Sequence, residues 1–316
     1  MLRNTDFRDE VSPDLSQGRR YTPAMVRDRL AAAAAAFDTT IDPRCFHAAP
    51  PQDEALARLE WLLTERQRCG LVIAAPGLGK SHLAAMAARR LGGLGAEVAV
   101  LSLHGLSEGD WLDLLLDRLP LDPASRSEPI RPWLKLENRL RENTLMGRPT
   151  VLVFDDIDHG PDDALEGVAR LAAAGEPRFG STVVVATAAP AALARVPDAI
   201  RQRAAVRIDL APWAEADVAA FMAATLSREG HAGDTFSDAA VATLARFSGG
   251  VPRVVARLAR LAALAAAGEG LDRVDAATVE RAWRELVPGE VLVEPRMAHE
   301  PSPDRPTVRA VRRLWG

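Results

Sequence analysis

The sequence has few of the residues that cross-link, charge or anchor a protein. Cys45 and Cys69 are the only cysteines among 316 residues, too few for a disulfide framework, so a reducing compartment is expected. The net charge is −4, and no overall positive field draws the chain to nucleic acid, although a local basic patch is compatible with this value. No apolar run reaches the ~18–20 residues of a membrane-spanning helix, and the N-terminal residues are too polar for a secretory signal. These absences predict a cytoplasmic protein without a membrane span.

Aromatic residues are also scarce, at 5% of the chain, whereas hydrophobic residues of all kinds reach 48%. Alanine, leucine and valine must therefore do most of the packing in the core. A charged fraction of 26% suits a water-soluble protein. The length allows one large domain or two of ordinary size.

Apolar segments alternate with helical patterns through the middle of the chain. The strand-like segments lie at 71–75, 97–103, 150–154, 182–187 and about 205–210. Segments with helical spacing fill the intervals near 81–92, 107–119, 131–146 and 162–174. Continuous apolar strands separated by helices are typical of a parallel sheet covered on both faces, so the sequence predicts a three-layer α/β core.

Helical patterns without strands flank this region. One helix is expected to begin at Thr22-Pro23 and to reach about Phe37, and another to begin at Pro50 and to end at Gly70. After Trp213 the strand pattern stops, and a small all-helical domain is expected, with helices near 214–229, 237–248, 251–268 and 276–286. The expected divisions are an N-terminal arm and helix at 1–39, the core at 40–212, the helical domain at 213–287 and a mobile Pro/Arg-rich tail at 288–316.

The segment 71–83 carries an apolar strand into a glycine-containing turn and then into a helix. A phosphate-binding loop needs this order, because its inward N–H groups and the helix N-terminus hold an anion. Lys80 is expected to reach the β- and γ-phosphates, and the Ser81 hydroxyl to bind Mg²⁺. Ala74 replaces the first glycine of the pattern G-x-x-x-x-G-K-[ST], so the loop must turn there with a backbone open to an L-residue. The expected nucleotide contacts in this segment are Ala74, Ala75, Pro76, Gly77, Leu78, Gly79, Lys80, Ser81 and His82.

A second motif completes the expected site. The apolar residues 151–154 run into Asp155 and Asp156, so a buried strand delivers two carboxylates beside the phosphate loop. Asp155 is expected to hold the Mg²⁺ shell, and Asp156 to orient or deprotonate the attacking water. Thr187 ends the next strand, where its hydroxyl either senses the γ-phosphate or makes a turn hydrogen bond. Together the two motifs predict a P-loop NTPase.

Two arginines are candidates for phosphate contacts. Arg203 is placed to reach the nucleotide of a neighbouring subunit and to stabilise the charge of phosphoryl transfer. The alternative for Arg201 and Arg203 is a solvated position. Arg253 follows Gly249-Gly250 at a helix start, where it would lie over the cleft and couple the helical domain to the nucleotide.

The motifs at 74–81, 155–156, 202–203 and 250–253 together resemble those of an AAA+ ATPase. The sequence resembles the ATPase domain of general secretion pathway protein A (ExeA) and, with it, the TniB-type transposition ATPases and the origin-recognition ATPases. The likeness covers roughly residues 40–287, with Asp156 in place of the more usual glutamate. It implies ATP and Mg²⁺ as ligands, with Lys80 on phosphate, Asp155 on metal, Asp156 as catalytic base, Arg203 as finger and Arg253 as lid sensor.

The resemblance implies an ATPase that couples ATP binding and hydrolysis to conformational change or to assembly with a partner. A homo-oligomer with shared active sites is expected, with activity that is weak or stimulated by the partner. The membrane span and wall-binding region of the secretion-type proteins and the winged-helix domain of the origin-binding relatives are not expected here. One alternative is an ATP-dependent DNA-binding adaptor of the transposition or replication type, based on Arg246, Arg253, Arg257 and Arg260. The other is a slow nucleotide switch with little hydrolysis, based on Ala74 and Asp156.

Overall fold

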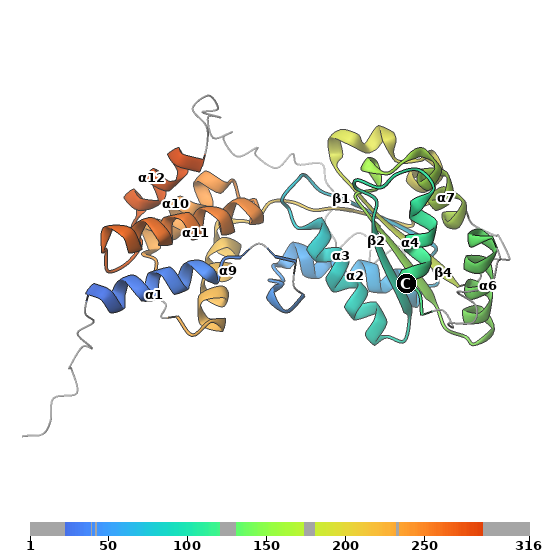
Figure 1. The fold of residues 1–316 in the computed structure, drawn as a ribbon, viewed down its shortest axis with the longest axis horizontal. Coiled ribbons are helices and arrows are strands. Elements are labelled where there is room, and N and C mark those ends of the chain that lie inside the picture. The colour runs from blue at the N-terminus through green and yellow to red at the C-terminus, as the bar shows by residue number, and fades with distance from the viewer. Residues whose placement is uncertain are drawn as a thin grey trace, which may run out of the picture.

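The structure is a computed structural model that describes residues 23–38, 40–41, 43–120, 131–173, 181–231 and 234–286. The predicted N-terminal arm, the predicted cap Thr22 and the predicted tail at 288–316 lie outside the described residues. The described chain forms two lobes, one built on a β-sheet and one entirely helical (Figure 1). In this described part, no helix has the length and apolar character needed to cross a membrane.

The sheet lobe is built on five parallel strands in the order β2-β3-β4-β1-β5. The strands are β1 (Cys69–Ile73), β2 (Glu97–Ser102), β3 (Thr150–Asp155), β4 (Thr182–Ala188) and β5 (Val206–Asp209). The three central strands β3, β4 and β1 are buried along their whole length. Their uninterrupted apolar runs follow from this burial, because both faces of the sheet are covered. The five predicted strands and their parallel arrangement are confirmed.

Helices cover both faces of the sheet. One face carries α2 (Pro50–Thr64) and α3 (Lys80–Gly93), and the other carries α4 (Asp110–Arg118), α6 (Pro132–Leu145), α7 (Asp162–Ala172) and α8 (Asp198–Arg203). The core beneath α2 and α3 consists of leucine, valine and alanine side chains together with Ile208. The core on the opposite face adds the rings of Trp111 and Phe154, which meet edge to face. The predicted three-layer α/β architecture is therefore confirmed.

The helical lobe contains α9 (Glu215–Arg228), α10 (Asp238–Ser248), α11 (Pro252–Glu269) and α12 (Ala276–Leu286). The N-terminal helix α1 (Pro23–Ala35) lies along α11 (Figure 1). The contact buries small side chains, which let the two helix axes approach closely: Ala33 and Ala34 of α1, and Ala256, Ala259, Ala262, Ala263 and Ala266 of α11. The sequence grouped this helix with the N-terminal arm, whereas the structure packs it on the helical lobe.

The prediction that Gly70 ends the second helix is wrong. Helix α2 ends at Thr64, and the chain turns through Arg66, which has a φ of 52°. Gly70 lies inside β1, where an added Cβ would come within 2.5 Å of Leu62 Cδ1. Glycine is needed there because α2 packs directly onto the strand, and this long-range contact is invisible in a local pattern.

Candidate active site

The phosphate-binding loop joins β1 to α3. Gly77 and Gly79 have φ values of 87° and 94°, in the left-handed region that favours glycine. Helix α3 begins at Lys80, directly after Gly79, so its free N–H groups and positive dipole end belong to the loop. Lys80 is 9% exposed, and its ammonium donates a hydrogen bond to the Ala74 carbonyl at 3.2 Å. Left-handed glycines and a helix N-terminus at one loop are an arrangement that suits an anion.

Ala74 fits the position at which the loop pattern has its first glycine. Its φ is not positive, since Arg66 and Asp156 are the described non-glycine residues with a positive φ. The Ala74 N–H donates to the Ala188 carbonyl at 3.1 Å, which continues the pairing of β1 with β4 by one residue. The expectation that the loop turns here with a backbone open to an L-residue is confirmed.

The two aspartates of the second motif lie at the carboxyl end of β3, beside Thr187 of β4. The register pairs Phe154 with Ala186, which brings Asp155 and Thr187 side by side. Thr187 is buried, and its hydroxyl donates to Asp155 Oδ1 and accepts from the Asp156 N–H at 2.9 Å. The Thr187 hydroxyl therefore donates its proton to the Asp155 carboxylate and holds the backbone of Asp156, so that Thr187 positions both aspartates.

The loop and the acidic motif meet across a short gap. Lys80 Nζ lies 3.6 Å from Asp156 Oδ1. Asp156 has a φ of 52°, a left-handed conformation that aspartate tolerates better than most residues. This turn directs the chain from β3 into the 3-10 helix η2 (Ile157–His159). The sequence placed the two motifs at one edge of the sheet, and the structure brings their side chains into contact.

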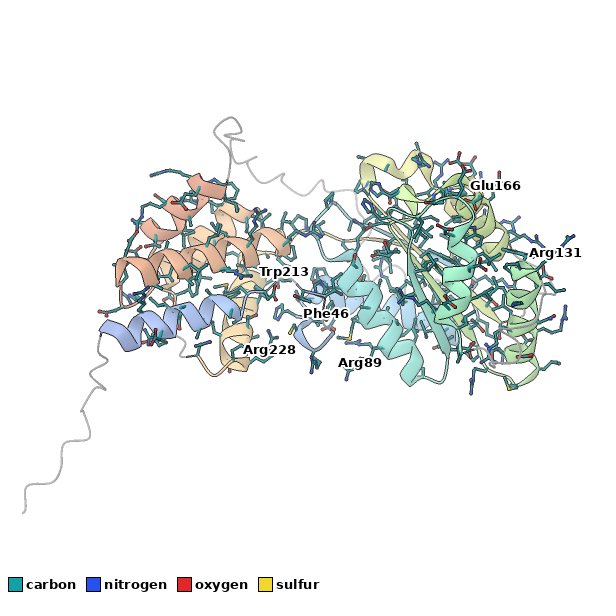
Figure 2. The ribbon with its side chains drawn as sticks, in the orientation of Figure 1. Phe46, Arg89, Arg131, Glu166, Trp213 and Arg228 are labelled. Carbon is teal, nitrogen blue, oxygen red and sulfur yellow. The ribbon has the colours of Figure 1, made fainter. Side chains whose placement is uncertain are left out.

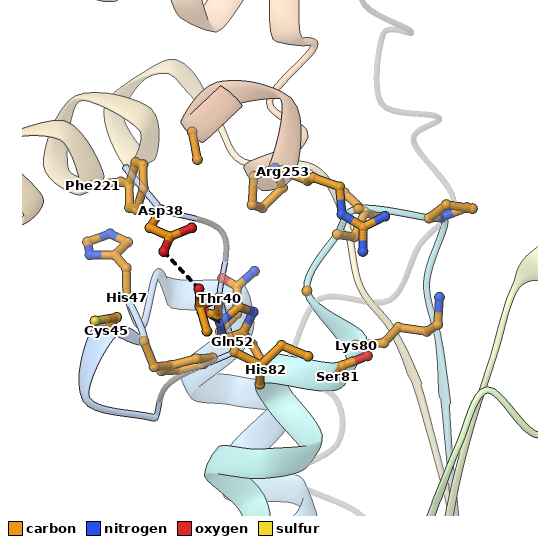
Figure 3. A pocket seen from close by; sticks show the side chains of 18 of the residues that line it. Asp38, Thr40, Cys45, His47, Gln52, Lys80, Ser81, His82, Phe221 and Arg253 are labelled. Atoms are coloured by element: carbon orange, nitrogen blue, oxygen red, sulfur yellow. Dashed lines mark hydrogen bonds between the residues drawn. The ribbon is translucent and has the colours of Figure 1, made fainter. Parts of the chain in front are cut away.

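A cavity of about 390 Å³ lies between the loop and the helical lobe (Figure 3). The predicted residues that line it are Pro76, Gly77, Leu78, Gly79, Lys80, Ser81, His82, Asp156 and Arg253. Helix α11 touches the loop directly, because the Arg253 N–H donates to the Gly77 carbonyl at 3.2 Å. An added Cβ on Gly77 would lie 2.9 Å from Val251 Cγ1. Glycine at this position therefore lets the helical lobe close on the loop.

Five predicted site residues do not line the cavity: Ala74, Ala75, Asp155, Thr187 and Arg203. Ala74, Asp155 and Thr187 are buried in the sheet next to it. Arg203 is the exposed last residue of α8, and its side chain makes no hydrogen bond or ion pair with any described residue. Arg201, in contrast, pairs with Asp198. A role for Arg203 at a nucleotide therefore requires the site of another subunit.

The end of the cavity away from the loop is built by residues that the motifs did not indicate. The segment between α1 and α2, which includes the 3-10 helix η1 (Pro43–Cys45), faces the helical lobe there, and Figure 2 shows Phe46 and Trp213 between the two lobes. The close-up in Figure 3 shows Asp38, His47 and Phe221 around this end. We call it the aromatic end; its lining residues are Asp38, Thr40, Ile41, Cys45, Phe46, His47, Gln52, Trp213, Phe221, Thr225 and Arg228.

Four aromatic rings line this end, those of Phe46, His47, Trp213 and Phe221. The His47 ring lies edge-on to Trp213 and to Phe221, with centroids 5.6 and 5.7 Å apart. Burial lowers the pKa of His47, and the nearby carboxylates of Asp217 and Asp53 oppose this effect without reversing it. The ring is therefore neutral at pH 7. Aromatic faces with a few polar groups at their edges suit a flat heteroaromatic ring.

Asp38 and Thr40 link the two lobes at the cavity wall. The Thr40 hydroxyl donates to Asp38 Oδ2 at 2.8 Å, and Asp38 Oδ1 lies 3.9 Å from Arg260 of α11. On the other side, His82 Nε2 lies 3.2 Å from the Thr40 carbonyl. Contacts therefore run from the helix that follows the phosphate loop to the helical lobe.

The donor set beside the loop suits Mg²⁺ held together with phosphate. Ser81 is the second residue of α3, and Asp155 is the last residue of β3, so the hydroxyl and the carboxylate come from the two motifs. No cluster of three or more histidine, cysteine, aspartate or glutamate side chains capable of binding a metal occurs in the described ranges. Mg²⁺ typically binds one or two protein oxygens together with substrate phosphates and water, and this pair fits that pattern.

Sequence comparison finds one partial relative. No protein-family model matches the chain. The chain is 25% identical to general secretion pathway protein A of Aeromonas hydrophila over 243 residues, which is 75% of this chain and 44% of that protein. It therefore spans less than half the length of this relative.

Solved structures share the fold more widely. Cdc6p of Pyrobaculum aerophilum superposes with a TM-score of 0.63 at 14% identity, over 80% of this chain and 71% of that one. The ORC2 protein of Aeropyrum pernix, solved as ADPNP-ADP complexes, gives 0.59 at 17% identity, over 79% and 71%. Drosophila ORC bound to DNA gives 0.60 at 17% identity, over 90% and 70%.

The chain has the AAA+ ATPase fold. The resemblance to the ExeA and origin-recognition ATPases, predicted from the motifs, is confirmed. Below, the sheet lobe is called the core and the helical lobe is called the lid.

Proposed function

We propose that the chain binds ATP in this cavity, with Mg²⁺, and hydrolyses it. The observation that carries the proposal is the 3.6 Å approach of Lys80 to Asp156, which joins the phosphate loop to the acidic motif at one point. A γ-phosphate held by the loop would lie between a cation and a carboxylate, the arrangement that phosphoryl transfer uses. The aromatic end gives the adenine ring a binding surface, and the AAA+ fold supports ATP as the ligand.

Each of the central residues has a defined task in this proposal. Lys80 and the loop N–H groups bind the β- and γ-phosphates. Asp156 orients the attacking water or takes its proton, and Thr187 holds Asp155 and Asp156 in place through its two hydrogen bonds. Ser81 and Asp155 hold Mg²⁺, which supplies charge neutralisation at the phosphate oxygens.

The lid couples the nucleotide to conformational change. Its contacts with the core include the hydrogen bond from Arg253 to Gly77 and the ion pair of Arg260 with Asp38. Gly77 and Asp38 both line the cavity, at its two ends. A nucleotide that touches both residues changes both contacts. The angle between lid and core therefore depends on the nucleotide bound, and a partner bound to the lid responds to that angle.

Steady-state phosphate release tests the hydrolysis. Wild type at high protein concentration, with and without duplex DNA, is compared with Lys80→Ala, which removes the ammonium. We expect turnover in wild type that falls by about 100-fold or more in Lys80→Ala, as the loss of a group that stabilises transition-state charge predicts. Equal rates of phosphate release in the two proteins under all conditions would exclude ATP hydrolysis by this site.

Arg203 supports a homo-oligomer with shared active sites. Its side chain is exposed and outside the cavity of its own chain, so as an arginine finger it serves the nucleotide of a neighbour. Arg203→Ala and Lys80→Ala are each expected to be inactive, and mixing them restores activity, because a mixed interface contains one intact Lys80 and one intact Arg203. Absence of recovery in mixtures of confirmed oligomers excludes the shared site.

A second candidate function is an ATP-dependent DNA-binding adaptor. The observation that favours it is Arg257, exposed on α11 and without an ion pair to any described residue. Arg246 and Arg260, by contrast, pair with Glu280 and Asp38. With ATP present, the affinity for duplex DNA should fall steeply as salt rises. In Arg257→Ala the slope of log affinity against log salt should be smaller. No retention of duplex at low salt excludes this candidate.

A further inference from the structure

Gln52 carries a nearly buried amide in the wall of the aromatic end, where the residue is 4% exposed. It is the third residue of α2 and follows Pro50 and Pro51, whose rings fix the backbone φ and make the start of the helix rigid. Its backbone N–H donates to the Ala49 carbonyl at 2.9 Å. The side chain therefore leaves a fixed point of the core, and Figure 3 shows it among the residues around the cavity.

The Trp213 indole fixes which way this amide faces. The indole Nε1–H donates to Gln52 Oε1 at 3.1 Å, and both side chains are buried. An indole nitrogen is a donor only, so its partner must be the amide oxygen and not the amide nitrogen. Trp213 is held in turn, because its backbone N–H donates to the Gly250 carbonyl at 2.8 Å. A half-turn of the amide would set its N–H groups against the indole N–H and leave the indole without an acceptor.

The rest of the amide is available to a ligand. Gln52 Nε2 makes no hydrogen bond to a described residue, and it does not belong to the fully buried atoms that lack a partner. Its N–H groups therefore reach open space, and the open space that Gln52 lines is the cavity. The amide oxygen keeps a second lone pair besides the one that accepts from Trp213. The amide thus offers the cavity donors at its nitrogen and an acceptor at its oxygen.

An amide fixed in one orientation distinguishes adenine from guanine and hypoxanthine. At position 6 adenine carries an amino group, which donates, next to a ring nitrogen, which accepts. The amide oxygen accepts from this amino group while the amide nitrogen donates to the ring nitrogen, as in the bidentate pairing of glutamine with adenine. Guanine and hypoxanthine carry an oxygen at position 6, so two oxygens would face each other. A free amide could turn over to suit that oxygen, but the hydrogen bond from Trp213 opposes the rotation.

We propose that Gln52, held in one orientation by Trp213, selects adenine over 6-oxopurines at the aromatic end of the cavity. The inference rests on the proposed ATP binding and deepens it, since it names the residue that reads the base. The phosphate end contacts a triphosphate that all nucleotides share, and the aromatic rings accept any flat base. Selection between bases therefore falls to the amide, because a site that pairs its buried polar groups with one ligand rejects the ligand that leaves them unpaired.

Calorimetric titration with Mg-ATP and Mg-ITP tests the proposal, because the two nucleotides differ only at position 6 and in the proton on the neighbouring ring nitrogen. Wild type should bind ATP about 10- to 100-fold more tightly than ITP, the range expected for one bidentate pair. Gln52→Met keeps the length of the side chain without its polar atoms and should bring this ratio of affinities close to one.

Trp213→Phe keeps an aromatic ring and removes the indole N–H, so the amide is free to turn over. The ratio of ATP to ITP affinity should fall in this variant as well. Phe221→Leu is the matched control, because it removes a ring that lies 5.0 Å from Trp213, centroid to centroid, and leaves the amide bonded to the indole. It should weaken both nucleotides alike. A partly unfolded fraction lowers both affinities equally, so the ratio is independent of it.

Equal affinities of wild type for ATP and ITP would overturn the selection of adenine and leave nucleotide binding intact. A ratio in Gln52→Met that matches the ratio in wild type would overturn the role of Gln52. A ratio that stays unchanged in Trp213→Phe, or that falls as far in Phe221→Leu, would overturn the orienting role of Trp213. If wild type binds neither nucleotide at millimolar concentration, the proposed ATP binding fails, and this inference fails with it.

Discussion

The two ends of the cavity are built in opposite ways. The phosphate end comes from two short contiguous motifs, 74–81 and 155–156, whose backbone and side chains meet at the edge of one sheet. The aromatic end comes from single residues of separate elements, such as His47 before α2, Trp213 before α9 and Phe221 within α9. In the proposed function, the groups that act on the phosphates therefore come from local motifs, whereas the surface for the adenine ring depends on how the lid meets the core.

This difference gives the two ends different sensitivities. A change at the phosphate end should alter the rate of the reaction, since its groups touch the charge that develops there. A change at the aromatic end should alter the affinity for ATP or the dependence of that affinity on pH, since its groups would contact the adenine ring, which does not react. The predictions below test this separation.

The largest effect is expected at Thr187. Thr187→Val keeps the shape of the side chain but removes the hydroxyl that holds both aspartates, so kcat should fall by about 100-fold with KM for ATP nearly unchanged. Thr182→Val, at the other buried end of β4, is the matched control and should keep its kcat. Equal kcat losses in the two variants would show that β4 packing, and not the hydroxyl, controls the rate.

The junction of loop and lid gives the next effect. Gly77→Ala and Gly79→Ala both place a Cβ at positive φ, but only at Gly77 does the Cβ meet Val251. Denaturant unfolding should therefore show Gly77→Ala to be about 1–3 kcal/mol less stable than Gly79→Ala, the usual cost of overpacking. Adding Val251→Ala should remove most of this excess. Identical losses at the two glycines contradict a lid closed on the loop.

Cys45 reports on the aromatic end without any substitution. It is exposed and lines the cavity, whereas burial raises the pKa of Cys69 to about 12 and makes that thiol inert. ATP at about ten times its Kd should slow alkylation of Cys45 about tenfold by occupancy. Inorganic triphosphate, which fills the phosphate end alone, should leave the rate unchanged. If ATP and inorganic triphosphate protect Cys45 from alkylation equally, the adenine ring does not lie at this end.

The smallest effect concerns His47 and pH. Burial lowers the pKa of His47 in the folded chain, so below about pH 6.5 the unfolded chain takes up the proton more readily. The contribution of the neutral His47 ring to the free energy of unfolding is therefore complete above pH 6.5 and is lost as pH falls towards the folded-state pKa. His47→Gln should flatten this part of the curve of unfolding free energy against pH. A curve identical to that of wild type contradicts the buried neutral ring.

Local patterns predicted the sheet, the layers and the phosphate end because each depends on contiguous residues. The apolar runs of β1, β3 and β4 are what burial on both faces demands, and the loop at 74–81 is complete in sequence. Gly70 was misread because a glycine after a helix can end it or can make room for it, and only the contact with Leu62 distinguishes the two.

The remaining features depend on partners far apart in the chain. The commitment of Thr187 to Asp155 follows from the register of β3 with β4, which no single segment contains. The aromatic end was missed for the same reason, since the spacing of His47, Trp213 and Phe221 carries no periodic pattern. The packing of α1 on α11, mediated by alanines, likewise has no marker beyond the composition of the two helices.

The central claim is that one cavity binds ATP through its phosphate loop. Calorimetric titration of Mg-ATP into wild type and Lys80→Ala tests it most directly. The account predicts one ATP per chain in wild type and an affinity at least about tenfold weaker in Lys80→Ala, the usual scale for a lost charged hydrogen bond. Equal affinities in the two proteins, or no binding to wild type at millimolar ATP, would contradict it.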